Sequence, residues 1–141
     1  MCVKQLSVFI ENTPGKLADF TDLLAKHQID ILSLCVADTT NYGIARIIVS
    51  NTDETAKILG ENGYTLRKTE VMAVVIPDES GALAKVLRCL AERQIVVEYL
   101  YSAVRGLKDK ALIVFRVDQL EKAENLLKEK GYQLLAQHDI A

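Results

Sequence analysis

The sequence has little of the chemistry that metal sites and catalytic centres need. Its three cysteines, Cys2, Cys35 and Cys89, are an odd number without a CxxC spacing, which argues against a disulfide framework and a structural zinc site. The two histidines, His27 and His138, form neither HxH nor HExxH, and we expect both to be exposed. GxSxG, GxxxxGK[ST] and GxGxxG runs are missing too. We therefore predict no metal, no cofactor and no catalytic residue.

Long hydrophobic runs and an excess of charge of one sign are also missing. The longest apolar runs have only the length of a strand, and the first residues lack the pattern of a signal peptide, so we predict a cytoplasmic protein. The formal net charge is −2, and cationic side chains alternate with acidic ones instead of forming a basic stripe. Neither nucleic acid nor a membrane is therefore an expected partner.

What the sequence does contain is an internal repeat. Residues 12–18 (NTPGKLA) match residues 78–84 (DESGALA), 66 positions later. This offset persists through residues 45–49 and 111–115 and becomes 68 at the pairs Gly63-Tyr64 and Gly131-Tyr132, which we explain by a longer loop at residues 117–120 than at residues 51–53. The repeat predicts two homologous units, residues 1–69 and 70–141.

Each half shows the same order of strand-like and helix-like patterns. In the first half, strands are predicted at residues 6–10, 31–37, 44–50 and 66–69, and helices at residues 16–28 and 53–62. In the second half, strands are predicted at residues 71–76, 96–103, 110–117 and 133–138, and helices at residues 80–93 and 119–130. Each helix has one apolar stripe, so both helices of a half must cover one face of an antiparallel sheet. The predicted fold is α+β, with two tandem ferredoxin-like βαββαβ units.

With this order, and with residues 28–31 (QIDI) and 94–97 (QIVV) after the first helix of each half, the chain resembles the ACT domain in its small tandem form. The resemblance implies that a free amino acid binds where the loop before the first helix meets a strand of a neighbouring ACT unit. It also implies allosteric regulation of a partner enzyme of amino-acid metabolism. The second copy departs from the pattern at Ser80, where Pro is usual, but Ser is itself a good helix cap. We expect a homodimer, because a two-unit chain otherwise leaves interface surfaces open.

The two strand-to-helix loops are the candidate ligand-binding segments. They are Asn12, Thr13, Pro14 and Gly15 in the first half, and Asp78, Glu79, Ser80 and Gly81 in the second. N–H groups in the first turn of a helix lack internal partners and suit a carboxylate, and both glycines tolerate a positive φ and close approach. Asn12 and Asp78 offer oxygens to an ammonium, and we expect the charged Asp78 to make the stronger contact.

Other interpretations remain open. The same loop residues serve any strand-to-helix connection, so the leading alternative is a structural or interaction module that binds no ligand and acts through its sheet edges or helices. The ferredoxin-like fold also hosts enzymes such as acylphosphatase, but these loops carry no Arg to centre a phosphate cradle. Aliphatic central strands do not provide the aromatic platform of RNA-binding sheets. Tyr64, Tyr99, Tyr101 and Tyr132 are predicted to be packing residues.

Overall fold

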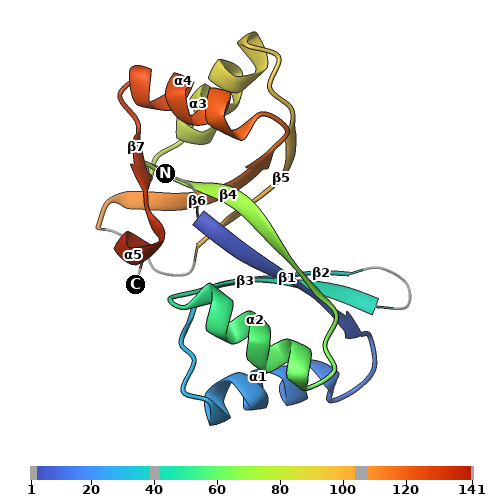
Figure 1. Cartoon of the computed structure of the whole chain (residues 1–141). Helices are drawn as coiled ribbons and strands as arrows, with labels where there is room; N and C mark the ends of the chain where they lie inside the picture. The colour runs from blue at the N-terminus through green and yellow to red at the C-terminus, as the bar shows by residue number, and fades with distance from the viewer. Residues whose placement is uncertain (1–2, 39–41, 104–107, 141) are drawn as a thin grey trace. The chain divides into compact units, whose positions relative to one another are not determined.

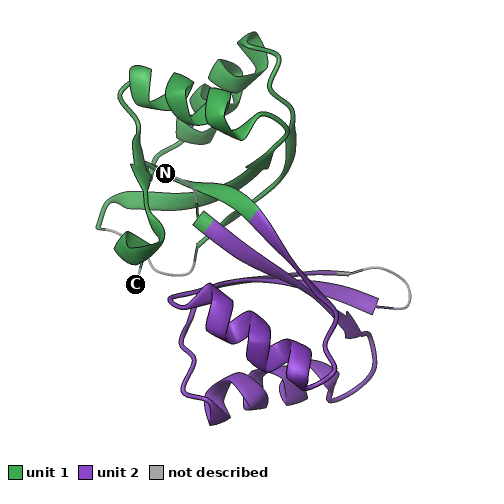
Figure 2. Ribbon diagram, in the orientation of Figure 1, with its two compact units in different colours: residues 1–3, 70–140 green, residues 4–69, 141 purple. Residues whose placement is uncertain are grey.

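The computed structural model describes residues 3–38, 42–103 and 108–140. These residues form two compact units, coloured separately in Figure 2. The N-terminal unit comprises residues 4–69, and the C-terminal unit comprises residues 70–140 together with Val3. Each unit has its own hydrophobic core.

The N-terminal unit consists of an antiparallel sheet with two helices on one face (Figure 1). Its elements are β1 (Val3–Glu11), α1 (Lys16–Lys26), β2 (Ile31–Asp38), β3 (Tyr42–Val49) and α2 (Thr52–Glu61). β3 pairs antiparallel with β1 and with β2. Alternate residues of a strand face the same side, so Leu6, Val8 and Ile10 of β1 are buried together with Phe20 and Leu24 of α1.

The C-terminal unit repeats this arrangement. Its elements are β4 (Leu66–Pro77), α3 (Ala82–Glu92), β5 (Val97–Ser102), β6 (Lys110–Val117), α4 (Leu120–Glu129), β7 (Gln133–Leu135) and α5 (Gln137–Ile140). β6 pairs with β4 and β5, and β7 pairs with β4. Helices α3 and α4 lie on one face of this sheet (Figure 1), and α3 buries Ala82, Val86 and Leu90. The predicted tandem βαββαβ fold is confirmed.

Two predicted elements differ from the structure. The strands predicted at residues 66–69 and 71–76 are one strand, β4, because no turn residue interrupts the extended chain between them. The last strand was predicted to reach His138, but β7 ends at Leu135 and the one-turn helix α5 follows. The Asp139 carboxylate accepts a hydrogen bond from the Ala136 N–H at 3.0 Å, and a single turn is too short to show a helical period.

The strand register places the two-residue insertion elsewhere than predicted. Ile10 pairs with Gly43 and its repeat partner Ile76 pairs with Ala111, so β3 and β6 are already offset by 68. The alignment of residues 45–49 with 111–115 was therefore wrong. β3 begins 11 residues after β2 begins, at positions 42 and 31, whereas β6 begins 13 residues after β5, at positions 110 and 97. The extra residues lie between β5 and β6, and the loops before α2 and α4 are equally long.

Several predictions about single residues can be compared with the structure. His27 and His138 are exposed, as predicted. Cys35 and Cys89 are free and partly buried, and Cys2 lies outside the described residues. Among the described residues, no cluster of three metal-ligating side chains occurs, and no helix is long and apolar enough to cross a membrane.

Tyr64 and Tyr132 are packing residues, as predicted. The ring of Tyr64 lies edge-on to that of Phe20, with 5.6 Å between centroids, and Tyr132 packs against the core of the C-terminal unit. Tyr101 is buried and Tyr99 is partly buried.

Candidate functional site

The two predicted binding loops have the same backbone conformation. The residue before α1 is Gly15, with φ of 85°, and the residue before α3 is Gly81, with φ of 88°. A Cβ at either position would meet no atom within 4 Å, so the dihedral angle rather than lack of space requires glycine.

Helix α1 begins with unsatisfied donors. The Lys16 N–H donates to the Thr13 carbonyl at 3.3 Å, and the Asp19 N–H donates to the Gly15 carbonyl at 2.8 Å. No side chain of the described residues caps this helix. The N–H groups of Leu17 and Ala18, between these two bonded residues, therefore remain available to a ligand.

Helix α3 begins in the same way. The Ala82 N–H donates to the Glu79 carbonyl at 3.2 Å, and the Lys85 N–H donates to the Gly81 carbonyl at 3.1 Å. Within the described part of the chain this helix also has no side-chain cap, so the N–H groups of Leu83 and Ala84 remain available to a ligand. The prediction that Ser80 caps the helix was wrong, because the left-handed Gly81 occupies the capping position and Ser80 lies one residue further out.

Helix α2 shows what a capped start looks like in this protein. The Asn51 side-chain oxygen accepts from the Glu54 N–H at 3.1 Å, and the Asn51 amide donates to the Glu54 carboxylate at 3.0 Å. The first of these bonds satisfies the N–H of the third helical residue, the donor that corresponds to the Ala18 N–H in α1 and the Ala84 N–H in α3. Helix α4 also begins without a side-chain cap among the described residues, so the property that α1 and α3 alone share among these four helices is a left-handed glycine before an uncapped first turn.

The side chains of the predicted loops are all exposed. The structure brings each set together in its own turn: Asn12, Thr13, Pro14 and Gly15 before α1, and Asp78, Glu79, Ser80 and Gly81 before α3. The Asp78 N–H donates to the Asp109 carbonyl at 3.2 Å, which fixes the second loop against the start of β6. The predicted ammonium contacts of Asn12 and Asp78 remain predictions.

A cavity of about 640 Å³ lies beside the first loop, in the N-terminal unit. Its walls come from the end of β1, the start of α1, the start of β3 and the turn after α2. They are formed by Phe9, Ile10, Glu11, Lys16, Asp19, Tyr42, Asn62, Gly63, Tyr64 and Thr65. This volume is within the range of small-molecule sites. We refer to it as the N-terminal cavity.

The N-terminal cavity combines charges of both signs with an aromatic wall. Lys16 supplies an ammonium, and Glu11 and Asp19 supply carboxylates. The rings of Phe9 and Tyr42 meet edge to face, with 5.7 Å between centroids, and both side chains are exposed. The cavity therefore offers partners for a carboxylate, for an ammonium and for an apolar group.

Tyr64 contributes a neutral hydroxyl to the same cavity. Burial raises the pKa of Tyr64, and the negative charge of Asp19 raises it further. The hydroxyl therefore stays protonated at neutral pH. It can both donate and accept a hydrogen bond.

Sequence reasoning found Gly15 but missed the N-terminal cavity. Residues 62–65 reach residues 9–19 only through the fold, where the Phe9 N–H donates to the Thr65 carbonyl at 3.0 Å. The sequence feature that could have indicated the cavity was Phe9, a large apolar residue that lies on the opposite face of β1 from the buried residues Val8 and Ile10.

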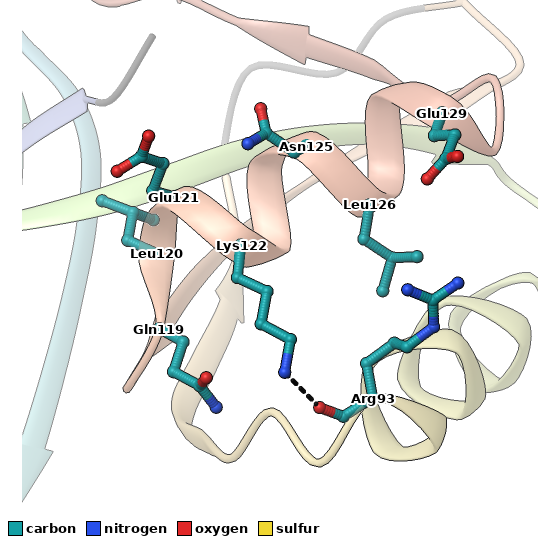
Figure 3. Close-up of a pocket in the computed structure, with 8 residues that line it drawn as sticks. All are labelled: Arg93, Gln119, Leu120, Glu121, Lys122, Asn125, Leu126 and Glu129. Atoms are coloured by element: carbon teal, nitrogen blue, oxygen red, sulfur yellow. Dashed lines mark hydrogen bonds between the residues drawn. The ribbon is translucent and has the colours of Figure 1, made fainter.

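A hollow of about 600 Å³ lies on the C-terminal unit, between α4 and the end of α3 (Figure 3). Figure 3 shows the Lys122 ammonium directed at the Arg93 carbonyl, to which it donates at 2.9 Å. The Gln119 amide donates to the Gln94 carbonyl at 3.2 Å. These side chains join α4 to the segment after α3, so we assign this hollow a structural role.

Comparisons with known proteins give a consistent result. The sequence model of a family described as an ACT domain pair matches residues 1–141. No curated protein matches the chain significantly. The crystal structure of protein BT0572 from Bacteroides thetaiotaomicron is 39% identical with a TM-score of 0.93, and the match covers 99% of this chain and 96% of that chain.

Two aspartate kinase structures share the fold at lower identity. The regulatory subunit of aspartate kinase from Thermus thermophilus, in a ligand-free form, is 16% identical with a TM-score of 0.65, covering 90% of this chain and 91% of that chain. A structure of aspartokinase alpha and beta subunits is 18% identical with a TM-score of 0.62, and the match covers 89% of this chain and 90% of that chain. The family match over the whole chain confirms the resemblance inferred from the repeated loops. The chain belongs to the ACT domain pair family.

Proposed function

We propose that this ACT domain pair senses a free amino acid and thereby regulates a partner enzyme of amino-acid metabolism. ACT domains are regulatory rather than catalytic. The observation that carries the proposal is the repeated helix start, in which a left-handed glycine precedes a first turn without a side-chain cap. Such a turn favours an anion by roughly 0.3 to 1 kcal/mol at an exposed position.

The N-terminal unit offers complementary groups for a whole zwitterion. The ligand carboxylate binds at the N–H groups of Leu17 and Ala18 or at the Lys16 ammonium. The ligand ammonium faces the carboxylates of Glu11 and Asp19 in the N-terminal cavity. The aromatic wall then receives the ligand side chain. Charge-assisted hydrogen bonds of this kind are stronger than neutral ones, and they distinguish an amino acid from an uncharged molecule of the same size.

The relatives support a regulatory role by analogy of fold. One of them is the regulatory subunit of aspartate kinase, a separate chain of almost the same extent as this one. By this analogy the partner is an enzyme encoded on another chain, and ligand binding changes the free energy of their association or the activity of the complex.

The proposal predicts a selective thermal shift. Ligand at 100 times its dissociation constant stabilises the folded state by about 2.7 kcal/mol, which raises the unfolding midpoint by on the order of 5 to 10 °C. Unfolding is measured by circular dichroism against each proteinogenic amino acid. We expect Asn12→Ala and Gly15→Val, in the loop before α1, to reduce the shift. Gly131→Val is the matched control, because Gly131 has φ of 89° and therefore carries the same backbone strain outside both loops.

Two outcomes would count against amino-acid sensing. If no amino acid shifts the midpoint, the chain is better explained as an interaction module that binds no such ligand. If the shift is equally reduced in Gly131→Val and Gly15→Val, backbone strain rather than the loop explains the effect. Asn12→Ala leaves the backbone unstrained, so it tests the loop even if both glycine variants fold poorly.

The proposal includes a homodimer. The regulatory site implied by the family lies between ACT units, and a second chain supplies further units. One chain has a mass of 15.7 kDa, and light scattering of the purified protein is expected to give twice this mass. A monomer at working concentration would contradict this part of the proposal.

A further inference from the structure

A third cavity, of about 470 Å³, lies in the C-terminal unit between α3 and the turn after α4. It is lined by Ala84, Lys85, Arg88, Cys89, Lys130 and Tyr132. We refer to it as the C-terminal cavity. It is separate from the hollow of Figure 3, which shares none of these residues.

The charged groups in the wall of the C-terminal cavity are all cations. Lys85 and Arg88 lie one turn apart on α3, and Lys130 directly follows α4. Among the described residues, no acidic side chain lines the cavity, and none of the three cationic side chains forms an ion pair or a hydrogen bond. All three residues are exposed. Cations around one hollow that has no acidic side chain in its wall create a positive local potential that concentrates anions.

The remaining wall residues add a neutral donor. Tyr132 is partly buried, and burial raises the pKa of its hydroxyl, with a smaller contribution from Cys89. The protonated hydroxyl can donate to an anion. Ala84 and Cys89, both on α3, complete the wall. The cavity therefore combines three cationic side chains with a neutral hydroxyl, from α3 and from the turn after α4.

The N-terminal cavity overlaps the equivalent place but differs in charge, because its wall combines Lys16 with Glu11 and Asp19. In α1, 66 positions before Lys85 and Arg88, stand Asp19 and Asp22. After α2, 68 positions before Lys130, stands Asn62. The tyrosine is kept, because Tyr64 occupies the place of Tyr132. The walls of the two cavities thus share the tyrosine, and Asp19 lines the N-terminal cavity where Lys85 lines the C-terminal cavity.

We propose that the C-terminal cavity binds a small multiply charged anion that carries phosphate or several carboxylate groups. A zwitterionic amino acid does not suit this cavity, because its ammonium would face three cations and no carboxylate. The chain as a whole carries a net charge of −2, so the positive charge is local and fits a small ligand better than an acidic macromolecule. The two units then respond to ligands of different charge. This inference does not depend on amino-acid sensing.

The test is a titration of the full chain, uniformly labelled with ¹⁵N, at constant ionic strength. Inorganic phosphate and citrate are the two probes, and amide signals are followed by NMR. We expect saturable shifts at residues 84–89 and 130–132 with at least one probe. The variant Lys85→Gln/Arg88→Gln should bind about ten-fold more weakly. The control Lys57→Gln/Lys108→Gln removes the same charge from exposed positions outside the cavity and should bind like the wild type.

Each outcome has a defined meaning. Saturation by phosphate alone indicates a phosphorylated ligand, and saturation by citrate alone indicates a polycarboxylate; both support the proposal. Failure of both probes to saturate overturns it, as does equal weakening in the two double variants, which would indicate a general effect of net charge. The amino-acid panel tests the loops separately, so either proposal can fail without the other.

Discussion

Val86→Asp is expected to unfold the C-terminal unit. Val86 is completely buried in the apolar stripe of α3, between Ala82 and Leu90. The surrounding core consists of apolar residues such as Met72 and Phe115, so the introduced carboxylate finds no cation there. An unpaired buried charge costs several kcal/mol, about 3 to 5 in measured cases. This is a large part of the stability of a small domain.

The expected result is measured by urea unfolding and by two-dimensional NMR, in which signals of residues 70–140 lose their dispersion. Ala91→Asp is the matched control, because Ala91 is exposed on the same helix. That control introduces the same charge and should cost about 1 kcal/mol, from helix propensity and the helix dipole. Comparable destabilisation by the two variants would contradict the packing described for α3.

Most of the fold could be predicted because each element repeats in a second copy. The glycines before α1 and α3 and those after α2 and α4 stand at matching positions, and all four have positive φ. Turn chemistry and hydrophobic period therefore agreed at these four helix ends. The homologous halves also supplied the family resemblance, which one short loop motif alone would not have done.

The register error has a simple physical origin. Side chains alternate across a strand with a period of two, so an alignment shifted by two residues keeps every apolar residue on its own face. The pairs Ile10–Gly43 and Ile76–Ala111 resolve the ambiguity, because only hydrogen-bonded partners define which residues are opposite. No pattern within a single strand contains this information.

The two cavities were outside the reach of the sequence for a related reason. Each joins the first helix of a unit to the turn after its second helix, segments about 45 residues apart along the chain. The charge reversal between Asp19 and Lys85 becomes visible only when both positions are known to face a cavity. On an isolated helix each would be an ordinary solvated charge.

Phe20→Ala and Phe9→Ala are expected to separate the stability of the N-terminal unit from its binding function. Phe20 is completely buried and supports the ring of Tyr64, with 5.6 Å between centroids. Its removal should cost about 3 to 5 kcal/mol in the free energy of unfolding, because the core cannot fill the resulting cavity. Phe9 is 40% exposed in the wall of the N-terminal cavity, so its removal should cost less than about 1 kcal/mol.

The binding measurements are expected to rank these variants in the opposite order. Phe9→Ala removes the aromatic wall from a folded unit, so the ligand identified by thermal shift should bind about ten-fold more weakly, as judged by calorimetry. Phe20 does not line the cavity, so at temperatures below the unfolding midpoint Phe20→Ala should weaken binding only through a displacement of Tyr64. If Phe9→Ala binds like the wild type, the cavity is not the place where the ligand side chain lies, and the bare turns before α1 and α3 must account for recognition alone.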